Sequence, residues 1–440
     1  MRSSRIRTVP RTVLTLKRML LTLNRMVLVL YLDEAASAPQ SAESLRHHVA
    51  WLQQGIGNPA SVHAAGASMR SGLNSARSLI AQGLNVADSS VVFTSGGTES
   101  NAMAVTGLAR AARDAQPERT RILVSAIEHS SVLTPARDVA EREGFSLEQI
   151  PVDSRGLLDV DALASMLDER VALVAVMAVN NEVGSMQPIE PVARLARDAG
   201  APVVCDAVAA PVPLMPGLVV HCDALTLAGH KFGGPTGTGA LVLAGNVVKV
   251  RGFVPMLPGS QEHGLRAGTP NVPGLMGMAA AFSEKLMAGA ADIKTPASGA
   301  GEGEAATEGE TPAEQLKRVV LAHAGDEVVV LGPETPQDCS PSIAMFLFPR
   351  VNGEAMLIEL EHRGVVCSSG SACHAGSTEP SHVLTALGIA AAQARTSVRM
   401  SIGRRLSQEE EATLGTAVAE SLAALAPRTP APRTPAPSPR

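Results

Sequence analysis

The stretch ALVAVMAV at residues 172–179 consists of eight apolar residues in a row. A run without polar alternation is typical of a strand that is covered on both faces of a parallel sheet. Amphipathic helical patterns such as IEPVARLARDAG separate several similar stretches. The expected strands are 91–95, 121–127, 172–179, 202–208, 224–230 and 239–245. This alternation predicts an α/β fold with a mainly parallel sheet covered by helices.

The composition bounds the class of protein. The chain has 440 residues, 45% of them hydrophobic but only 2% aromatic, so its core must consist of Ala, Val, Leu and Met. That length is enough for two or three domains. The net charge of -5 gives no reason to expect a nucleic-acid partner. No stretch reaches the ~18 apolar residues of a membrane span, so we expect neither direct nucleic-acid binding nor membrane insertion.

Shifts in composition divide the chain into segments. Residues 288–315 are acidic and rich in Ala and Gly, and the C-terminus is rich in Pro; both compositions are typical of disorder. The predicted segments are a basic extension (1–29), a large domain whose first part can pack with the small domain (30–265), a connecting helical region (266–287), a low-complexity insertion (288–315), a smaller α+β C-terminal domain (316–425) and a disordered tail (426–440).

The N-terminus allows three interpretations. Seven Lys or Arg residues and no acidic residue precede Asp33. This pattern loosely imitates a secretory signal, and an Arg-, Ser- and Thr-rich start also resembles an organelle transit peptide. We favour an unstructured or mis-started extension on a cytoplasmic protein, with a mitochondrial location as the alternative.

Five cysteines are scattered along the chain, without a CxxC pair or a Cys/His cluster at zinc spacing. We therefore expect reduced thiols and no resident metal. Cys373 differs from the others because it lies in the Ser/Gly-rich stretch SSGSACHAGSTEP (368–380), between a predicted strand and a predicted helix. This position suits either a small residue in a turn or a thiol that must reach a substrate.

Polar motifs follow several predicted strands. In TSGGTESN (94–101), the glycines permit a tight turn, and Thr98 with the free N–H groups of the next helix can hold an anion. The others are EHSSVL with His129, VNNEVG with Asn180 and Asn181, CDAVAAP with Asp206, and AGHKFGGPTGTG with Lys231. Each motif alone also fits an ordinary turn or cap. Except for Lys231, these residues lie at the end of a predicted strand or just beyond it. Ligands bind at the carboxyl ends of strands in open α/β sheets, so this shared placement favours one site.

Ten motifs in order resemble the cysteine desulfurases, which are class V, fold-type I pyridoxal-phosphate enzymes. They are YLDEAASAP, GNPASVH, FTSGGTESN, EHSSVL, NNEVG, CDA, GHKFGGP, LRAGTPNVP, SSGSAC and VRMSIGR. The similarity runs from about residue 30 to 425. The resemblance implies a large domain with a mainly parallel, seven-stranded sheet covered by helices, and a smaller α+β C-terminal domain.

The resemblance also implies roles for matching residues around pyridoxal phosphate. Lys231 would be the Schiff-base lysine, and His129 would stack on the cofactor ring and take part in proton transfer. Asp206 would pair with the pyridine nitrogen, and Asn181 would approach the ring's phenolic oxygen. The phosphate would be held by Gly97, Thr98, His230 and, from the neighbouring subunit of a homodimer, Thr269.

For the substrate, the resemblance implies that Arg399 and Asn181 hold the carboxylate of L-cysteine. Arg suits this role because its planar fork binds both oxygens. Cys373 would take the sulfur as a persulfide, leaving alanine, and would pass it to an acceptor such as an iron–sulfur scaffold or a tRNA thiolation protein. Cys373 could also ligate a nascent iron–sulfur cluster, whereas Cys367 is assigned to packing.

Other functions stay open at this point. A selenocysteine lyase and another class V pyridoxal-phosphate transferase or lyase share most of these motifs, and a non-catalytic scaffold descended from the enzyme is a further alternative. The scaffold is motivated by two departures from the family: Ala209 stands where Gln is usual, and Ala228 stands where Ser is usual. The first change removes a hydrogen bond to the cofactor's ring oxygen, and the second removes a phosphate ligand.

Overall fold

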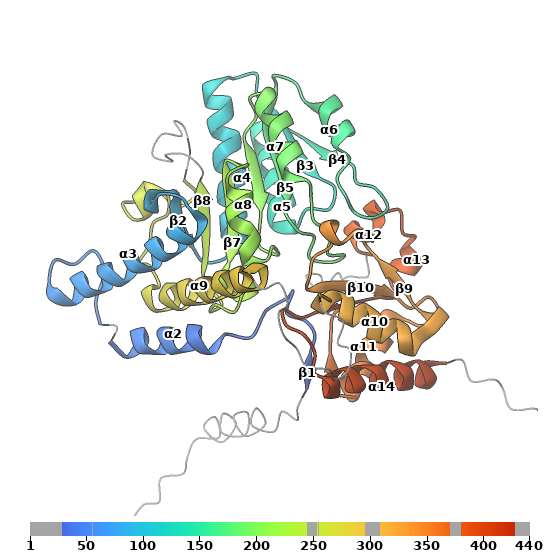
Figure 1. Cartoon of the computed structure of the whole chain (residues 1–440). Helices are drawn as coiled ribbons and strands as arrows, with labels where there is room; N and C mark the ends of the chain where they lie inside the picture. The colour runs from blue at the N-terminus through green and yellow to red at the C-terminus, as the bar shows by residue number, and fades with distance from the viewer. Residues whose placement is uncertain are drawn as a thin grey trace, which may run out of the picture.

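A computed structural model of the chain describes residues 29–54, 56–243, 253, 255–294, 309–369 and 380–426, with side chains left aside for 290–294. Its centre is a seven-stranded sheet in the order β2-β8-β7-β6-β5-β3-β4 (Figure 1). The strands are β2 (Val91–Thr94), β3 (Arg121–Ser125), β4 (Ser146–Ile150), β5 (Val171–Met177), β6 (Val203–Asp206), β7 (Ala224–Ala228) and β8 (Gly239–Leu243). All pairs from β4 to β7 are parallel, whereas β8 is antiparallel to both β7 and β2. The predicted mainly parallel α/β sheet is confirmed.

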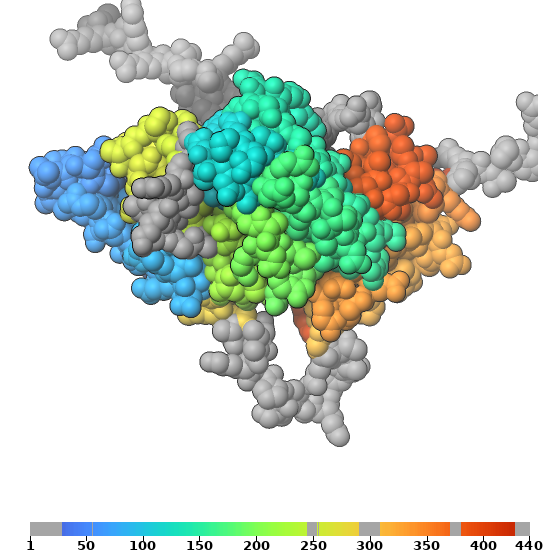
Figure 2. All heavy atoms as spheres, turned by 90° about the horizontal axis from the view of Figure 1, so that it is seen from above, coloured from blue at the N-terminus to red at the C-terminus, as the bar shows by residue number. Residues whose placement is uncertain are grey.

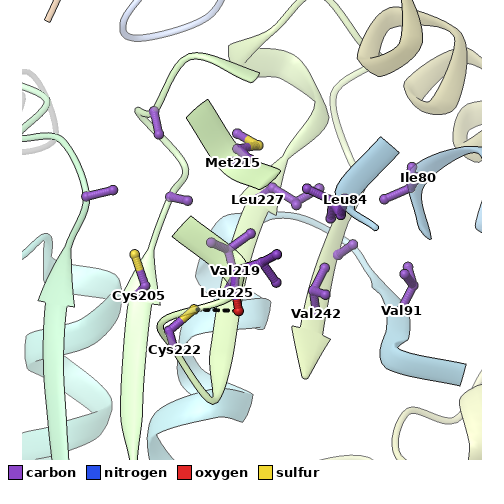
Figure 3. Close-up of a cluster of buried hydrophobic side chains, with 14 of the residues drawn as sticks. Ile80, Leu84, Val91, Cys205, Met215, Val219, Cys222, Leu225, Leu227 and Val242 are labelled. Atoms are coloured by element: carbon purple, nitrogen blue, oxygen red, sulfur yellow. Dashed lines mark hydrogen bonds between the residues drawn. The ribbon is translucent and has the colours of Figure 1, made fainter. Parts of the chain in front are cut away.

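Helices cover both faces of this sheet, which explains why central strands such as β5, β7 and β8 are buried along their whole length. On one face, α3 (Ala64–Leu84), α7 (Ile189–Asp198), α8 (Met215–Val219) and α9 (Val272–Lys294) share a hydrophobic cluster with the sheet. Figure 3 shows part of this cluster, where Val219 and Leu225 lie close to Cys222. On the other face, α4 (Gly97–Ala115) and α5 (Ser130–Glu143) form a second cluster.

The C-terminal unit has its own core. Strands β9 (Val329–Leu331), β10 (Ile343–Leu347) and β12 (Ser397–Ser401) form an antiparallel sheet in the order β12-β10-β9. It packs with α10 (Pro312–Ala324), α11 (Gly353–His362) and α14 (Gln408–Leu425). Strand β1 (Leu30–Tyr31) pairs in parallel with β11 (Val365–Val366), so the first described residues lie with the C-terminal unit.

The C-terminal unit and the N-terminal helices lie at opposite ends of the molecule, with the large sheet between them (Figure 2). A further hydrophobic cluster joins the sheet to the C-terminal unit and includes Met177, Val183, Met345 and Leu384. The shorter helices are α2 (Ala42–Gln54), α6 (Val160–Met166), α12 (His382–Ala386) and α13 (Ala391–Ala394). Among the described residues, none of the helices is both long and apolar enough to cross a bilayer.

Two details differ from the sequence-based expectations. Strand β4 was not expected because its sequence, SLEQI, is largely polar, as suits an edge strand with exposed residues. Both ends of the predicted insertion 288–315 are helical, since α9 continues to Lys294 and α10 begins at Pro312. Thr311 and Glu314 form a capping box there, which explains why α10 begins at this point. The predicted basic extension, except its last residue, and nearly all of the Pro-rich tail lie outside the described residues.

Candidate active site

Four predicted site residues follow parallel strands of the large sheet. Asp206 is the last residue of β6, and Lys231 ends the short 3₁₀ turn that follows β7. His129 caps α5 shortly after β3, and Asn181 follows β5. Because the carboxyl ends of parallel strands meet at one edge, these residues gather along the same edge of the sheet.

Asp206 is 5% exposed and is held by neutral donors. The side-chain amide of Asn101 donates to Asp206 Oδ2 at 2.7 Å, and the backbone N–H of Val208 donates to Oδ1 at 2.9 Å. Asn101 in turn accepts from the Thr226 hydroxyl at 2.6 Å. Hydrogen bonds to a carboxylate favour its charged form. The arrangement therefore suits a buried anion.

The same Asn101 connects Asp206 to His129. Its amide also donates to Ser131 Oγ at 2.8 Å, and Ser131 Oγ lies 2.8 Å from His129 Nδ1. The backbone N–H of Ser131 donates to that same ring nitrogen at 3.1 Å. Since Nδ1 accepts, the proton of the neutral imidazole is on Nε2. We call Asn101, His129, Ser131, Asp206 and Thr226 the Asp206 network.

Lys231 and His230 lie in the turn that follows β7, the strand that carries Thr226 of this network. The Lys231 ammonium donates to the backbone oxygens of Ala35 and Ala36 at 2.6 and 3.0 Å. Burial, with a smaller contribution from the charge of Lys231, lowers the pKa of His230 to about 4. His230 is therefore neutral near pH 7.

Helix α4 begins at the predicted phosphate-binding motif. Gly97 is its first residue, and a Cβ atom there would lie 2.6 Å from Val208 Cγ2, so only glycine fits without displacing that side chain. The Ala228 methyl lies nearby, 3.5 Å from the same position. Thr98 is exposed in the first turn, where backbone N–H groups have no acceptor within the helix. Such a helix start can bind an anion such as a phosphate.

Arg399, on β12, reaches the sheet edge from the C-terminal unit. It is 2% exposed, and its Nη1 donates to the Asn181 carbonyl oxygen at 2.8 Å. Its Nη2 donates to Asp33 Oδ1 at 2.6 Å. Within the described part of the chain, its Nε has no hydrogen-bond acceptor although it is buried. A buried donor without an acceptor is costly, so this nitrogen is suited to a ligand. We call Arg399, Asp33 and Asn181 the Arg399 clamp.

Glu128 is a fully buried carboxyl next to His129 in the sequence. Its Oε1 accepts from the backbone N–H of Met177 at 2.5 Å, while its Oε2 has no partner among the described residues. Burial, together with the nearby charge of Asp206, raises the pKa of Glu128 well above its usual value. Burial beside Asp206 therefore disfavours the charged form of Glu128.

Two predicted site residues do not join this arrangement. Thr269 is exposed, and no contact links it to the other site residues within the described part of the chain. Cys373 lies in 370–379, outside the described residues, so its role stays a prediction. The segments before and after it do reach the site: Ser368 exchanges backbone hydrogen bonds with Arg399, and His382 Nε2 lies 2.9 Å from the Glu128 carbonyl oxygen. Burial raises the pKa of Cys367, and its side chain packs against the C-terminal core.

Sequence reasoning missed several residues of the site: Asn101, Ser131, Asp33 and Glu128. All four lie inside motifs that had drawn attention for other residues, namely TSGGTESN, EHSSVL and YLDEAASAP. Asn101 follows Thr98 by three positions on α4, so its place in the motif was a usable signal. The motif did not indicate the partner of Asp33, which is 366 residues away in the sequence.

The arrangement provides complementary binding groups for one kind of ligand. Lys231 supplies a primary amine, Asp206 an anion for a ring cation, and the start of α4 an anion site. Arg399 supplies a buried guanidinium for a carboxylate. Together these groups suit an aromatic aldehyde phosphate with an amino acid beside it.

Comparisons with known proteins agree with this chemistry. The chain matches the aminotransferase class-V family over residues 30–414. It is 38% identical to an IscS-like cysteine desulfurase of Mycobacterium tuberculosis, across 85% of this chain and 91% of that protein. It is 36% identical to the cysteine desulfurase NifS of Azotobacter vinelandii, across 87% and 89% of the two chains.

Solved structures show the same relationship. A NifS-like protein superposes with a TM-score of 0.77 at 27% identity, over 90% of this chain and all of that one. SspA in complex with cysteine superposes with a TM-score of 0.68 at 27% identity, over 86% and 99% of the two chains. The chain therefore belongs to the aminotransferase class-V family and, within it, to the cysteine desulfurases.

Proposed function

We propose that this protein is a pyridoxal-phosphate-dependent cysteine desulfurase that converts L-cysteine to L-alanine and keeps the sulfur as a persulfide on Cys373. The observation that carries the proposal is the buried side chain of Arg399 at the sheet edge. Its Nη1 donates to the Asn181 carbonyl oxygen, and its Nε has no acceptor among the described residues. A substrate carboxylate would supply the missing acceptor. SspA, one of the solved structures similar to this chain, is described in complex with cysteine.

The site residues fit pyridoxal phosphate as the cofactor. Asp206 is held as an anion by two neutral donors and can pair with a protonated pyridine nitrogen. Gly97, Thr98 and His230 would hold the phosphate at the start of α4, and Asn181 would lie beside the ring. When bound, pyridoxal phosphate supplies an electron sink for bonds at the substrate's α carbon. The family relationship supports the same cofactor.

The chain's own residues would then orient the substrate and move protons. Arg399 and Asn181 hold the carboxylate, Lys231 takes and returns a proton at Nζ, and His129 presents Nε2–H to the reacting groups. The Cys373 thiolate attacks the substrate sulfur. One S–S bond forms, the substrate's C–S bond breaks, and the β carbon takes up a proton, so cysteine plus thiol give alanine plus persulfide.

We also infer that the active form is a homodimer. Leu45, Val49 and Leu52 lie on one face of α2 and are 49%, 39% and 59% exposed. Such an apolar face on a surface helix is typical of an interface. Thr269 lies on a segment that two ion pairs connect to the large domain: the buried pair Arg77–Glu262 at 2.7 Å and the partly buried pair Arg266–Glu99 at 2.7 Å. A second copy could receive the exposed Thr269 at its phosphate.

The sulfur acceptor is proposed only by class. An acceptor protein such as an iron–sulfur scaffold would take the persulfide from Cys373, and Cys373 could ligate the nascent cluster. Relatives named IscS-like cysteine desulfurase and NifS support a sulfur-donating role.

The decisive experiment incubates purified, pyridoxal-phosphate-loaded protein with L-cysteine. We expect stoichiometric alanine, a 32-Da mass increase of the Cys373 peptide (roughly the mass of one sulfur atom), and loss of the visible cofactor absorption in Lys231→Ala. Cys373→Ser should keep that absorption but form no persulfide. A wild-type protein that stays colourless after pyridoxal phosphate is added would disprove the proposal and favour a scaffold.

A further inference from the structure

The turn at residues 33–36, in the motif YLDEAASAP, contacts both ends of the candidate site. The backbone N–H of Ala36 donates to the Asp33 carbonyl at 3.0 Å, which closes the turn. Its Ala35 and Ala36 carbonyls accept from Lys231, and its Asp33 carboxylate accepts from Arg399. One short segment therefore contacts the amine proposed for the cofactor and the guanidinium proposed for the substrate.

Other bonds fix the position of this turn. Tyr31 Oη lies within 3.1 Å of the backbone oxygens of Asp33 and Ser37, and the Ala35 N–H donates to Ser401 Oγ at 2.9 Å. The backbone of Asp33 also bridges to Ser401 on β12, the strand that carries Arg399. Asp33 is thus held firmly enough to fix the position of another side chain.

Asp33 supplies one of two acceptors seen on the Arg399 guanidinium. The side chains are 17% and 3% exposed, so the ion pair is largely shielded from water. The Asn181 carbonyl binds Nη1 and Asp33 binds Nη2, which leaves Nε as the buried donor without an acceptor in the described structure. Because the guanidinium is planar and rigid, fixing Nη1 and Nη2 also fixes the direction of the Nε–H bond.

We propose that Asp33 is a positioning residue for substrate recognition: it fixes the Arg399 fork so that Nε is left for the carboxylate of the amino-acid substrate. The inference rests on the proposed function. Asp33 acts through Arg399 and does not itself touch the substrate. It also balances the guanidinium charge while the site is empty, since a buried cation without a partner is unfavourable.

The test compares Asp33→Ala with the wild type as pyridoxal-phosphate-loaded proteins. Loss of a charge-assisted hydrogen bond typically weakens binding about tenfold to a hundredfold. We expect the KM for L-cysteine to rise by about that factor in Asp33→Ala, with a smaller change in kcat. Asp33→Asn keeps an oxygen that accepts from Nη2, so its KM should rise less than that of Asp33→Ala.

A matched control is available at the next residue. Glu34 Oε2 accepts from the Gly403 N–H at 2.8 Å, and no bond to Arg399 is found for it. Glu34→Ala therefore removes a neighbouring carboxylate without touching the clamp and should leave the KM unchanged. L-Cysteinamide, which lacks the carboxylate, should be turned over equally by wild type and Asp33→Ala.

Binding of L-alanine, followed by the visible absorption of the bound cofactor, tests the inference apart from sulfur chemistry. We expect its dissociation constant to rise about tenfold in Asp33→Ala. An unchanged KM and unchanged alanine affinity would overturn the role of Asp33 while leaving the desulfurase proposal intact. A wild type that forms no alanine from L-cysteine would instead overturn the proposed function. If Asp33→Ala does not fold, Asp33→Ser, whose hydroxyl is too short to reach Nη2, replaces it in the same comparison.

Discussion

The Asp206 network and the Arg399 clamp lie at the same sheet edge but are built in opposite ways. In the network, the single side chain of Asn101 bonds to Thr226, Ser131 and Asp206. All four residues belong to the large sheet and its helices. The clamp joins three segments that are far apart in the sequence, and it leaves Arg399 Nε without an acceptor in the described structure.

This difference indicates different tasks. A carboxylate whose donors are already in place is prepared to keep one charge state and one orientation, which suits a permanent cofactor. A buried donor that lacks an acceptor costs stability until a ligand arrives, which suits a substrate that comes and goes. The network is therefore expected to contribute to stability and the clamp to recognition.

Breaking the network should have the largest effect. In Asn101→Leu the new side chain is similar in shape to that of Asn, but three buried partners lose their hydrogen bonds. Each loss costs about 1–3 kcal/mol. We expect the free energy of unfolding to fall by roughly 3 kcal/mol and the desulfurase kcat/KM to fall about a hundredfold. Urea unfolding and alanine formation from L-cysteine measure the two effects.

Thr106→Val serves as the control for that variant. Thr106 lies on the same helix and is 7% exposed, and among the described residues its hydroxyl donates to the Ala102 carbonyl of its own helix alone. We expect normal cofactor absorption from this variant. If Asn101→Leu were as active and as stable as Thr106→Val, the bonds of Asn101 would contribute neither to stability nor to catalysis.

Replacing Arg399 together with Asp33 should separate recognition from stability. Replacement of both members of a buried ion pair by apolar residues is often neutral for stability, and Arg399 already has an unpaired donor. We therefore expect the double variant Asp33→Leu/Arg399→Leu to change the free energy of unfolding by no more than about 1 kcal/mol, while kcat/KM for L-cysteine falls roughly tenfold to a hundredfold. A destabilisation equal to that of Asn101→Leu would contradict the contrast between the two regions.

The sequence predicted the network's place better than its contacts. The apolar runs revealed the strands, and parallel strands bring their carboxyl ends to one edge, so Asp206, His129 and Asn181 could be grouped in advance. Lys231 was added to this group only by the family resemblance. The bonds made by Asn101 depend on how α4 is rotated against the sheet, which no local pattern specifies. The pairing of Asp33 with Arg399 requires the first described residues to lie beside β12, a contact across 366 positions.

Glu128 offers the smallest and most selective test, because it is an unsatisfied group beside the otherwise satisfied network. Burial holds the pKa of this carboxyl above its value in the unfolded chain, near 4.3. The folded state therefore binds more protons, and the wild-type free energy of unfolding should fall as pH rises above about 4. Glu128→Gln mimics the neutral acid and should remove that slope, so the variant and the wild type should be similar at pH 4. At pH 8 the variant should be more stable by at least about 1 kcal/mol, as measured by urea unfolding.

The substitution Glu169→Gln, at an exposed residue, controls for the loss of one charge. A wild type that loses no stability relative to Glu128→Gln between pH 4 and 8 would mean that Glu128 is ionised in the fold, and that Asp206 shares its edge of the sheet with a second anion.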